Sequence, residues 1–541
     1  MNGWNELKNK IIEKDLCSLC GTCIGLCPIA TLSYDSKNER IINERNNCVY
    51  CGLCIKNCPG ESFDYKYMNK LVFMEDDSKI NADVGFYQKI LRGHSLHEFV
   101  QKNCSSGGIA TEIGLYMLEK GLVDYVIGIT GEYPYYRVSA INDKEQLYQT
   151  MQSKYTFVPT NEILRFILAN KGKYLYVGLP CQVQGLRKAC ENNRVLSERI
   201  ELCVAIFCGF NMERDATDFL IYKSNIKNIK KIEYRAVRNG NTGFLIKGDQ
   251  KEFFISKHGY TILNTFYSRK RCWKCYDLTG EFSDVSLGDA WEKGHGWSRI
   301  IIRTEKARCL IESMRRDGFI FYEPSSVNDI YETQSKLIFF KKRSFATRRH
   351  LIKHFPDNNI ELKKNSLLVK LKASLFLFIM VIGKTKPFRL LLRLCPVKIL
   401  EKISEFMRNG TSIEIINYGI WGIVTVLTSF ISYWVFIQLG LDYKISNVLA
   451  IIFTKLTAYL TNKYFVFHSK CENISALIRE FSGFLISRGL SGIVEIFGLI
   501  LLVDFFHIGK YFGKILLIVI TTILNYSLGK NFVYKSSKRN T

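Results

Sequence analysis

Two copies of one cysteine pattern lie within the first 60 residues of the 541-residue chain. In each copy, three cysteines recur at every third position, and a fourth stands directly before a proline. Three thiolates so spaced can hold three corners of an iron–sulfur cage, while the proline turns the fourth toward the other cage. The pattern therefore predicts two [4Fe–4S] clusters, one bound by Cys17, Cys20, Cys23 and Cys58, the other by Cys48, Cys51, Cys54 and Cys27.

Zinc is the competing metal for clustered cysteines, but its structural sites use pairs of cysteines rather than two complete sets at this spacing. Gly21 and Gly52 follow the second cysteine of each set, where a residue without a side chain lets the backbone curve close to a cluster. Residues 1–16 are polar and do not resemble a signal peptide. We therefore expect the cysteines to lie in the reducing cytoplasm and the chain to carry electrons.

The chain is too long for one hydrophobic core, and its composition changes along its length. We predict a multidomain protein in four parts. These are an α+β two-cluster ferredoxin head over residues 1–75, an α/β domain over 80–350, a basic amphipathic linker over 351–410, and a four-helix transmembrane bundle over 411–541.

Short apolar runs predict the strands of the α/β domain. A Gly-Asp pair at 248–249 separates two further runs, which predicts a hairpin. The predicted strands are Val123–Thr130, Tyr174–Val177, Ile200–Phe207, Val285–Leu287 and Ile300–Ile302, with Phe244–Lys247 and Phe253–Ser256 in the hairpin.

A second group of cysteines lies in loops next to these strands. Cys181 and Cys208 each follow a predicted strand, and Cys272 and Cys275 precede another. Because ligands bind at the carboxyl ends of strands in α/β sheets, the four could hold a third cluster; ordinary buried or free cysteines explain the spacing equally well. We expect the other cysteines to be packing residues: Cys104, Cys190, Cys203, Cys309, Cys395 and Cys471.

Small residues at positions 105–108 open a helical stretch that runs to Leu118. The free N–H groups at the start of a helix can cradle a phosphate, so Ser105, Ser106, Gly107 and Gly108 are candidates for cofactor binding. A plain helix cap explains the same residues equally well.

Four mostly apolar segments in the last 130 residues predict transmembrane helices, at Ile415–Ile437, Ile445–Phe467, Phe484–Phe506 and Phe512–Leu528. Lys and Arg are more frequent before the first, between the second and third, and after the fourth, which predicts that both termini are cytoplasmic. Buried helices of a soluble bundle are the alternative, but four such segments leave no polar face.

The predicted bundle contains an internal repeat. Gly419-x-x-Gly422-Ile-Val recurs as Gly489-x-x-Gly492-Ile-Val, and the Lys463–Phe467 run recurs at 530–534, which predicts two parallel helical hairpins. Lys455 and Glu495 fall near the middle of adjacent spans. Because a lone charge at mid-membrane costs at least about 2.5–3.5 kcal/mol, we expect these two side chains to pair.

Lys and Arg outnumber Asp and Glu by 75 to 50, a net charge of +25. The excess is not arranged as a basic stripe with interleaved aromatic residues, so we expect no nucleic acid partner. Between Glu361 and Gly410 there are eleven Lys or Arg against three Asp or Glu, which suits an anionic membrane surface. Within this part, Leu367–Gly383 is apolar and flanked by lysines, and we expect a helix that lies on the lipid rather than a fifth crossing.

These motifs, together with Ser153-Lys154-Tyr155, Gly178-x-Pro180-Cys181-Gln182, Arg271-Cys272-x-x-Cys275 and Gly288-Asp289-x-Trp291, resemble the family of coenzyme F420 hydrogenase/dehydrogenase β subunits over residues 15–350. The resemblance implies an FAD-containing α/β domain with an iron–sulfur cluster close to the flavin, and so favours the third cluster. The flavin-binding residues that we expect are Ser106, Gly107, Gly108, Lys154, Gly178, Pro180 and Gln182.

The last 130 residues resemble the GtrA family of four-span proteins, which is linked to the movement or modification of polyprenyl-linked sugars; the run Asn462–Phe467 carries the likeness. Together the two resemblances predict a membrane-anchored iron–sulfur flavoprotein oxidoreductase in polysaccharide or polyprenyl-linked sugar metabolism. Its expected partners are membrane lipid, a polyprenyl-phosphate-linked sugar, and a redox protein or small electron acceptor. The alternatives are a glycan-translocating or anchoring protein with an electron-transfer head, and an electron-transfer subunit of a separate enzyme.

Overall fold

The computed structural model describes residues 3–74, 80–408, 411–467, 469, 473–501, 520–522 and 524–534. The chain divides into two compact units, Met1–Lys402 and Ile403–Thr541. The cysteine motifs and the α/β region share the first unit, so the predicted ferredoxin head does not separate from the α/β domain. The finer division into four domains remains a prediction.

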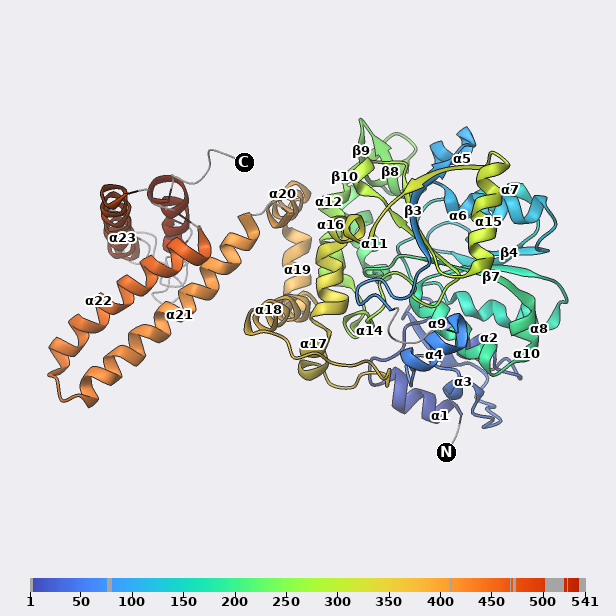
Figure 1. Cartoon of the computed structure of the whole chain (residues 1–541), viewed down its shortest axis with the longest axis horizontal. Helices are drawn as coiled ribbons and strands as arrows, with labels where there is room; N and C mark the ends of the chain where they lie inside the picture. Colours follow the sequence, from blue (N-terminus) through green and yellow to red (C-terminus); the bar gives the residue numbers. More distant parts are fainter. Residues whose placement is uncertain are drawn as a thin grey trace. The chain divides into compact units, whose positions relative to one another are not determined.

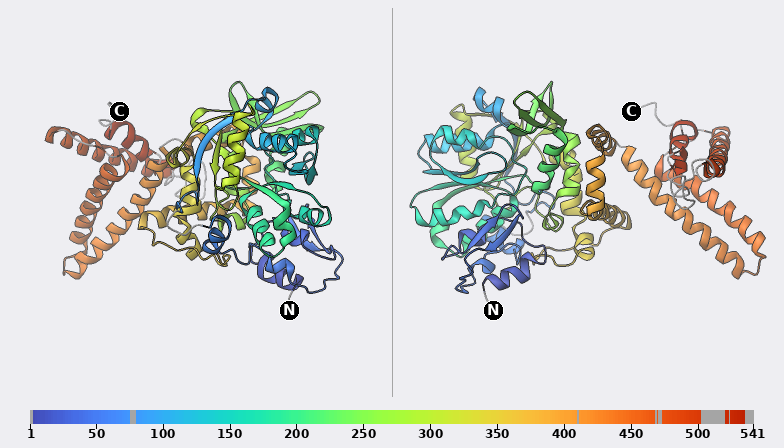
Figure 2. Two further views of the ribbon diagram at one scale, coloured as in Figure 1. Left: turned by 45° about the vertical axis from the view of Figure 1, so that its right-hand side comes forward. Right: turned by 180° about the vertical axis from the view of Figure 1, so that it is seen from behind.

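The N-terminal segment is a small α+β structure around the cysteines, drawn dark blue in Figure 2. A short helix carries the third cysteine of each set, and a two-stranded antiparallel hairpin connects the sets. Leu7, Ile11, Leu19 and Ile41 form its core with cysteine side chains. Its elements are α1 (Trp4–Leu7), η1 (Lys8–Ile12), α2 (Thr22–Gly25), β1 (Leu32–Asp35), β2 (Arg40–Asn43), α3 (Leu53–Lys56) and α4 (Tyr65–Phe73).

A mixed sheet forms the centre of the first unit, with its strands in the order β13-β3-β12-β11-β7-β6-β4-β5. The pairs β4–β6, β6–β7 and β7–β11 are parallel and the others are antiparallel. The carboxyl ends of β4, β6, β7 and β11 therefore lie at the same end of the strands, which we call the carboxyl edge of the sheet. The strands are β3 (Lys89–Ser95), β4 (Tyr125–Thr130), β5 (Arg137–Ile141), β6 (Tyr174–Gly178), β7 (Ile200–Ile206), β11 (Val285–Asp289), β12 (Ser298–Ile302) and β13 (Ile320–Pro324).

Helices cover both faces of this sheet (Figure 1). On one face, α6, α7 and α15 bury Val126, Leu175 and Val204. On the other, α8, α9 and α10 pack with the N-terminal segment against Tyr174, Tyr176 and other strand residues. The helices around the sheet are α5 (Glu98–Asn103), α6 (Ile109–Glu119), α7 (Lys144–Gln149), η3 (Thr160–Ile163), α8 (Leu164–Ala169), α9 (Pro180–Glu191), α10 (Arg194–Arg199) and α15 (Glu305–Arg316).

A second sheet of three antiparallel strands has its own core. Its hairpin pairs Glu252 with Lys247 and Ser256 with Gly243, which confirms the predicted turn at 248–249. The predicted strands are confirmed as β4, β6, β7, β11 and β12. The elements here are α11 (Arg214–Ser224), β8 (Ile229–Arg238), β9 (Asn241–Gly248), β10 (Glu252–Ser256), α12 (Lys257–Thr261), α13 (Leu263–Tyr267), α14 (Lys270–Trp273) and η4 (Trp291–Lys293).

The basic region after the second sheet is helical, and one of its apolar faces packs against the rest of the first unit. In α18, Ala373, Leu377, Met380 and Gly383 are buried, and a Cβ atom at Gly383 would lie 2.5 Å from the Phe266 ring. The helices of this region are α16 (Val327–Ile338), η5 (Phe339–Arg343), α17 (Phe345–Leu351), α18 (Leu367–Gly383), α19 (Lys386–Leu394) and α20 (Val397–Arg408).

The opposite side of α18–α20 exposes large apolar side chains, among them Leu371, Phe378, Leu390 and Leu394. Because lysines and arginines flank these residues, we expect a chain ending at Gly410 to sediment with anionic vesicles and to be released by high salt. The double change Leu390→Glu and Leu394→Glu should abolish this sedimentation. Retention through salt and carbonate washes would contradict the interfacial arrangement and favour a membrane crossing.

The second unit is helical. Its elements are α21 (Thr411–Gln438), α22 (Tyr443–Thr461), η6 (Asn462–Val466), α23 (Ile474–Ile500) and η8 (Gly529–Val533). The π-helices η6 and η8 occupy matching positions of the predicted repeat, and the rings that follow them, Phe467 and Tyr534, stack with centroids 4.7 Å apart. Across the described residues, no helix combines the length and apolar character that a membrane crossing requires.

A buried ion pair that the sequence did not reveal lies in the second unit. The Lys463 ammonium group donates to Glu480 Oε1 at 2.7 Å, and Tyr459 and Ser469 also donate to this carboxylate. Both charged side chains are about 5% exposed or less. The Glu495 side chain and most of the fourth predicted span lie outside the described residues, so the Lys455–Glu495 pair remains a prediction.

Candidate functional site

Each predicted set of four cysteines lines one small cavity in the N-terminal segment. The first cavity is enclosed by Leu7, Ile11 and Ile41 and is lined by Cys17, Cys20, Cys23 and Cys58. The second is enclosed by Gly3, Trp4 and Leu53 and is lined by Cys27, Cys48, Cys51 and Cys54. In both cavities, the cysteine before the proline therefore lies with the three cysteines of the other copy. Among the described side chains, no group of three or more Cys, His, Asp or Glu meets the geometry of a site for one metal ion.

Backbone N–H groups point at the sulfur atoms of both cavities. Trp4 donates to Cys48 Sγ at 3.5 Å, and Gly60 donates to Cys58 Sγ at 3.4 Å. Burial raises the pKa of the Cys58 thiol to about 12 and that of Cys23 well above its usual value. A buried thiolate is therefore costly without metal, and the four convergent sulfurs with N–H donors fit the ligand set of an iron–sulfur cluster.

The four dispersed cysteines come together at the carboxyl edge of the large sheet. Cys181 is the second residue of α9, just after β6. Cys208 follows β7, and Cys272 and Cys275 lie in and after α14. Burial raises the pKa of Cys181 well above its usual value, and Cys208, Cys275 and Cys272 raise it further through their negative charge. The structure thus brings together the four residues that the sequence offered for a third cluster.

Two cations lie beside this third group. Burial acts to raise the pKa of Cys275, but Lys341 and Arg271 outweigh it, so this pKa is lowered. The Lys341 side chain is buried in η5, more than 60 residues further along the chain, and also interacts with Cys208 and Cys272. A fixed buried cation favours the anionic, metal-binding form of the cysteines.

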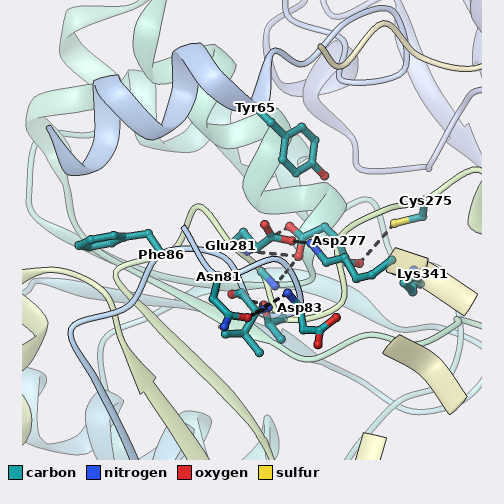
Figure 3. Close-up of polar contacts among 12 residues, drawn as sticks. Tyr65, Asn81, Asp83, Phe86, Cys275, Asp277, Glu281 and Lys341 are labelled. Carbon is teal, nitrogen blue, oxygen red and sulfur yellow. Dashed lines mark hydrogen bonds and ion pairs between the residues drawn. The ribbon is translucent and has the colours of Figure 1, made fainter. Parts of the chain in front are cut away.

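A polar network holds the segment after Cys275 in place (Figure 3). The Cys275 thiol donates to the Asp277 carbonyl at 3.4 Å, and the Asp277 carboxylate accepts from the Gly280 and Glu281 N–H groups. The Glu281 carboxylate in turn pairs with the buried Lys342. These bonds fix the backbone on which Cys275 lies.

The first and third cysteine groups lie against each other. Cys20 is among the charges that act on Cys181. A Cβ atom at Gly185, one turn along α9, would lie 3.4 Å from Cys20 Sγ and 2.2 Å from Thr22 Oγ1. Only glycine lets α9 approach the first cavity this closely. The first and third cysteine groups are therefore neighbours in the structure.

The Ser105–Gly108 loop packs on the same edge of the sheet. Ser106 donates to the Trp297 carbonyl at 2.7 Å, and the Gly107 N–H group donates to Ser298 Oγ at 2.8 Å. A Cβ atom at Gly107 would lie 2.5 Å from the Gly93 carbonyl oxygen. Close packing on β3 and β12 thus explains the glycine, and the loop lies at the start of the 11-residue helix α6.

The other predicted flavin-binding residues are largely engaged within the protein. Gln182 bonds to the Leu179 N–H group and the Val158 carbonyl. Lys154 donates to carbonyls of residues 150–152, and burial lowers its pKa to about 8. Gly178 ends β6 and Pro180 is the first residue of α9, so both shape the turn that carries Cys181.

A cationic cluster near this loop was not predicted as a site. Arg235 is 5% exposed and pairs with Asp289, while Arg235 and Lys257 both lie against the Trp291 ring. Burial lowers the pKa of Lys257 to about 7. Arg235 Nε is buried without a hydrogen-bond partner in the described structure, and Tyr260 lies close enough to act on the Arg235 charge. The Gly288-Asp289-x-Trp291 motif was the one sequence signal for this cluster.

The remaining cysteines are mostly as predicted. Cys104 and Cys203 are buried, and Cys190 and Cys395 are half-buried. Cys309 is exposed on the outer face of α15, so the prediction that it is a packing residue was wrong. Its helical neighbours Ala307, Leu310 and Ile311 carry the buried face instead. Cys471 lies outside the described residues.

Known protein families match most of the chain. The β subunit of coenzyme F420 hydrogenase/dehydrogenase matches over residues 90–165 with its N-terminal domain and over 171–327 with its C-terminal domain. A 4Fe-4S dicluster domain matches residues 9–60, and the GtrA/DPMS transmembrane domain matches residues 417–534.

Individual relatives cover different parts of the chain. The coenzyme F420-dependent sulfite reductase of Methanocaldococcus jannaschii is 29% identical over 313 residues, 55% of this chain and 46% of that protein, so the chain spans about half its length. A subunit of the F(420)H(2) dehydrogenase of Methanosarcina mazei is 25% identical, over 62% of this chain and 92% of its own length. The teichoic acid glycosylation protein GtcA of Listeria monocytogenes is 34% identical over 23% of this chain and 87% of its own length.

A chain of the F420-reducing [NiFe] hydrogenase complex from Methanosarcina barkeri superposes with a TM-score of 0.43 at 20% identity, over 52% of this chain and 98% of that chain. The matches to the dicluster domain and to the β-subunit domains cover the parts of the chain that hold the three cysteine groups. The chain combines the N- and C-terminal domains of the coenzyme F420 hydrogenase/dehydrogenase β-subunit family with an N-terminal 4Fe-4S dicluster domain and a C-terminal domain of the GtrA/DPMS family.

Proposed function

We propose that this chain is a membrane-anchored iron–sulfur flavoprotein that passes electrons between its ferredoxin-type clusters and a flavin bound at the carboxyl edge of the large sheet. The observation that carries the proposal is the convergence of three groups of four cysteines in one compact unit, with the first group against the third. Each cluster would carry one electron at a time, and the flavin would exchange electrons with a substrate in pairs.

The cationic cluster of Arg235 and Lys257 supports a flavin site beside the third cysteine group. A flavin nucleotide carries phosphate groups, and the two cations exceed the single facing carboxylate, Asp289. The unpartnered Arg235 Nε lies among these groups and can donate to a phosphate oxygen. Arg235 electrostatically influences Cys104, which bonds to the Ser106 carbonyl, so the cluster adjoins the 105–108 loop.

This proposal predicts a loss of flavin affinity when Lys257 is replaced. Burial and the nearby Arg235 lower the pKa of Lys257 to about 7, whereas Asp289 raises it. The group is therefore charged below about pH 7 and loses its charge as the pH rises. Lys257→Met should weaken FAD binding about tenfold at pH 6, given about 1.5–3 kcal/mol for a charged hydrogen bond, and less at pH 8.5.

The measurement is FAD titration of the anaerobically purified chain, followed by flavin fluorescence. Lys251→Met, on the exposed turn before β10, is the matched control and should bind FAD as the unmodified chain does. A chain that releases no flavin on denaturation and binds none when FAD is added would refute the flavin. Equal FAD affinity of the Lys257 and Lys251 variants would instead show that the flavin does not bind at this cluster.

We further propose that the electrons serve cell-surface polysaccharide or polyprenyl-linked sugar metabolism. The GtrA-like unit supports this, because its relatives include a protein described as a teichoic acid glycosylation protein. A chain ending at Gly410 should then lose activity in cells while it keeps its iron in vitro. Full activity of the shortened chain would favour an electron-transfer subunit of a separate enzyme. The relative from Methanosarcina mazei is itself a subunit of a dehydrogenase, which also supports this role.

A further inference from the structure

A cavity of about 490 Å³ opens between the N-terminal segment and α18 in the first unit. This volume is within the range of small-molecule sites. Its wall comes from four stretches of the chain: residues 13–15, residues 270, 273 and 274 around α14, residues 351–354 after α17, and one face of α18.

The α18 wall of the cavity is mostly apolar, with Leu377 buried and the other apolar side chains exposed. Ser374, Leu377, Phe378 and Val381 lie on one face of the helix at the spacing of successive turns. Phe378 is 61% exposed and Val381 52%, so the first unit does not cover these side chains. The wall continues into the apolar surface of α18–α20 that we expect to lie on lipid, which gives an apolar ligand a route from the membrane.

The opposite wall is polar and rich in lysine. Lys270 pairs with Asp15 at 2.9 Å, and Lys274 donates to the Lys14 carbonyl at 2.8 Å. In the described part of the chain, the ammonium groups of Lys14 and Lys353 make no hydrogen bond or ion pair. A ligand that places carbonyl oxygens against this wall would meet free donors.

The cavity also adjoins two cysteine groups. Asp15 lies two residues before Cys17, and Trp273 and Lys274 lie between Cys272 and Cys275. Cys17 and Cys272 both pack against the core that contains Cys23. A cavity that is apolar on one side, rich in donors on the other side and lined by residues next to two cysteine groups suits a ligand that is soluble in lipid and active in redox chemistry.

We propose that this cavity binds a prenylated quinone, with the ring against Lys14 and Lys353 and the tail along α18. Conversion of the quinone to its quinol takes two electrons, one from each of the adjoining first and third clusters, and two protons from water that reaches the polar wall. The proposal rests on the clusters of the proposed function but not on the flavin. An anionic phospholipid would also match the lysines, but it gives no reason for the adjoining cysteine groups.

The test is photolabelling of the full chain, purified anaerobically in neutral detergent, with an azido-substituted benzoquinone that carries a short prenyl tail. Mass spectrometry should place the label in residues 13–15, 351–354 or 374–381, and menadione should reduce labelling at least tenfold. Phosphatidylglycerol at the same concentration should not. Labelling elsewhere, or equal protection by phosphatidylglycerol, would overturn the quinone site.

Two cavity variants and one control variant make the test independent of folding. Ser374→Trp fills the cavity and should lower labelling at least tenfold, whereas Leu371→Trp, on the same helix but outside the cavity, should not. Phe378→Asp changes an exposed lining residue and should lower labelling as well. Iron content checks that each variant is intact. Unchanged labelling of both cavity variants with full iron content would refute the quinone site. A full chain with normal iron content but no bound flavin would refute only the proposed flavin.

Discussion

The change Cys58→Ala is expected to remove the cluster of Cys17, Cys20 and Cys23 and to leave the cluster of Cys48, Cys51 and Cys54 in place. Cys58 belongs to the second sequence copy, but its side chain lines the first cavity. A cubane with three protein thiolates is labile, so about four of the expected iron atoms should be lost. Iron analysis and electron paramagnetic resonance of the reduced protein measure this loss.

Two comparison variants show whether the loss follows the cavity or the sequence copy. Cys54→Ala should remove the other cluster, because Cys54 lines the second cavity with Cys27. Cys309→Ala changes an exposed cysteine remote from every group and should leave the iron content unchanged. If Cys58→Ala and Cys54→Ala remove the same signal, the crossed ligand sets are wrong.

Arg348→Met is expected to destabilise the first unit by more than about 3 kcal/mol and to deplete the third cluster. The Arg348 side chain is 0% exposed and donates to the carbonyls of Trp273, Cys275 and Lys341. Each buried carbonyl that loses its donor costs roughly 1–3 kcal/mol. These carbonyls belong to the segments that carry Cys272, Cys275 and the cation beside them, so the cysteine group should lose its geometry as well.

The neighbouring arginine provides the control for this prediction. Arg349 is partly exposed and makes one long bond, 3.3 Å, to Asn358 Oδ1. Arg349→Met should change the free energy of unfolding by less than about 1 kcal/mol. Urea unfolding followed by circular dichroism, with iron analysis of the folded protein, compares the two variants. Similar stability and iron content for both would show that the Arg348 network does not support the cysteine group.

Cysteine spacing allowed the ligand groups to be predicted, because local sequence fixes most of their geometry. Three cysteines at every third position curve around one point whatever the rest of the chain does. Cys181 and Cys208 were found because the turns after parallel strands meet at one edge of a sheet. The structure places both residues at that edge, with Cys272 and Cys275 beside them.

The residues that support these groups could not be predicted, because they come from distant parts of the chain. Lys341 and Arg348 lie on η5 and α17, in a region whose sequence is typical of an ordinary basic helix. Arg235 lies in β8, where its neighbours Lys230, Lys231 and Glu233 suggest an exposed strand. No local sequence pattern distinguishes an arginine that donates to buried carbonyl groups from an arginine that is exposed to solvent, because the difference depends on tertiary packing.

The architecture was predicted unevenly for the same reason. The strands β4, β6, β7, β11 and β12 are buried apolar runs, which mark them in the sequence. The strands β3 and β13 carry charged residues such as Arg92 and Glu323, which pair across the two strands, and these were missed. The π-helices η6 and η8 occupy matching positions of the predicted repeat in the C-terminal unit, whereas its two hairpins and its topology across a membrane stay predictions.

The central claim, that the first unit is an iron–sulfur flavoprotein, is tested most directly by quantifying metal, acid-labile sulfide and flavin together in the anaerobically purified full chain. Three [4Fe–4S] clusters and one flavin correspond to about twelve iron atoms, about twelve sulfide ions and about one flavin per chain. A measured content of about eight iron atoms per chain would support two clusters and contradict the third. Zinc in place of iron, with no sulfide and no flavin, would contradict the account as a whole.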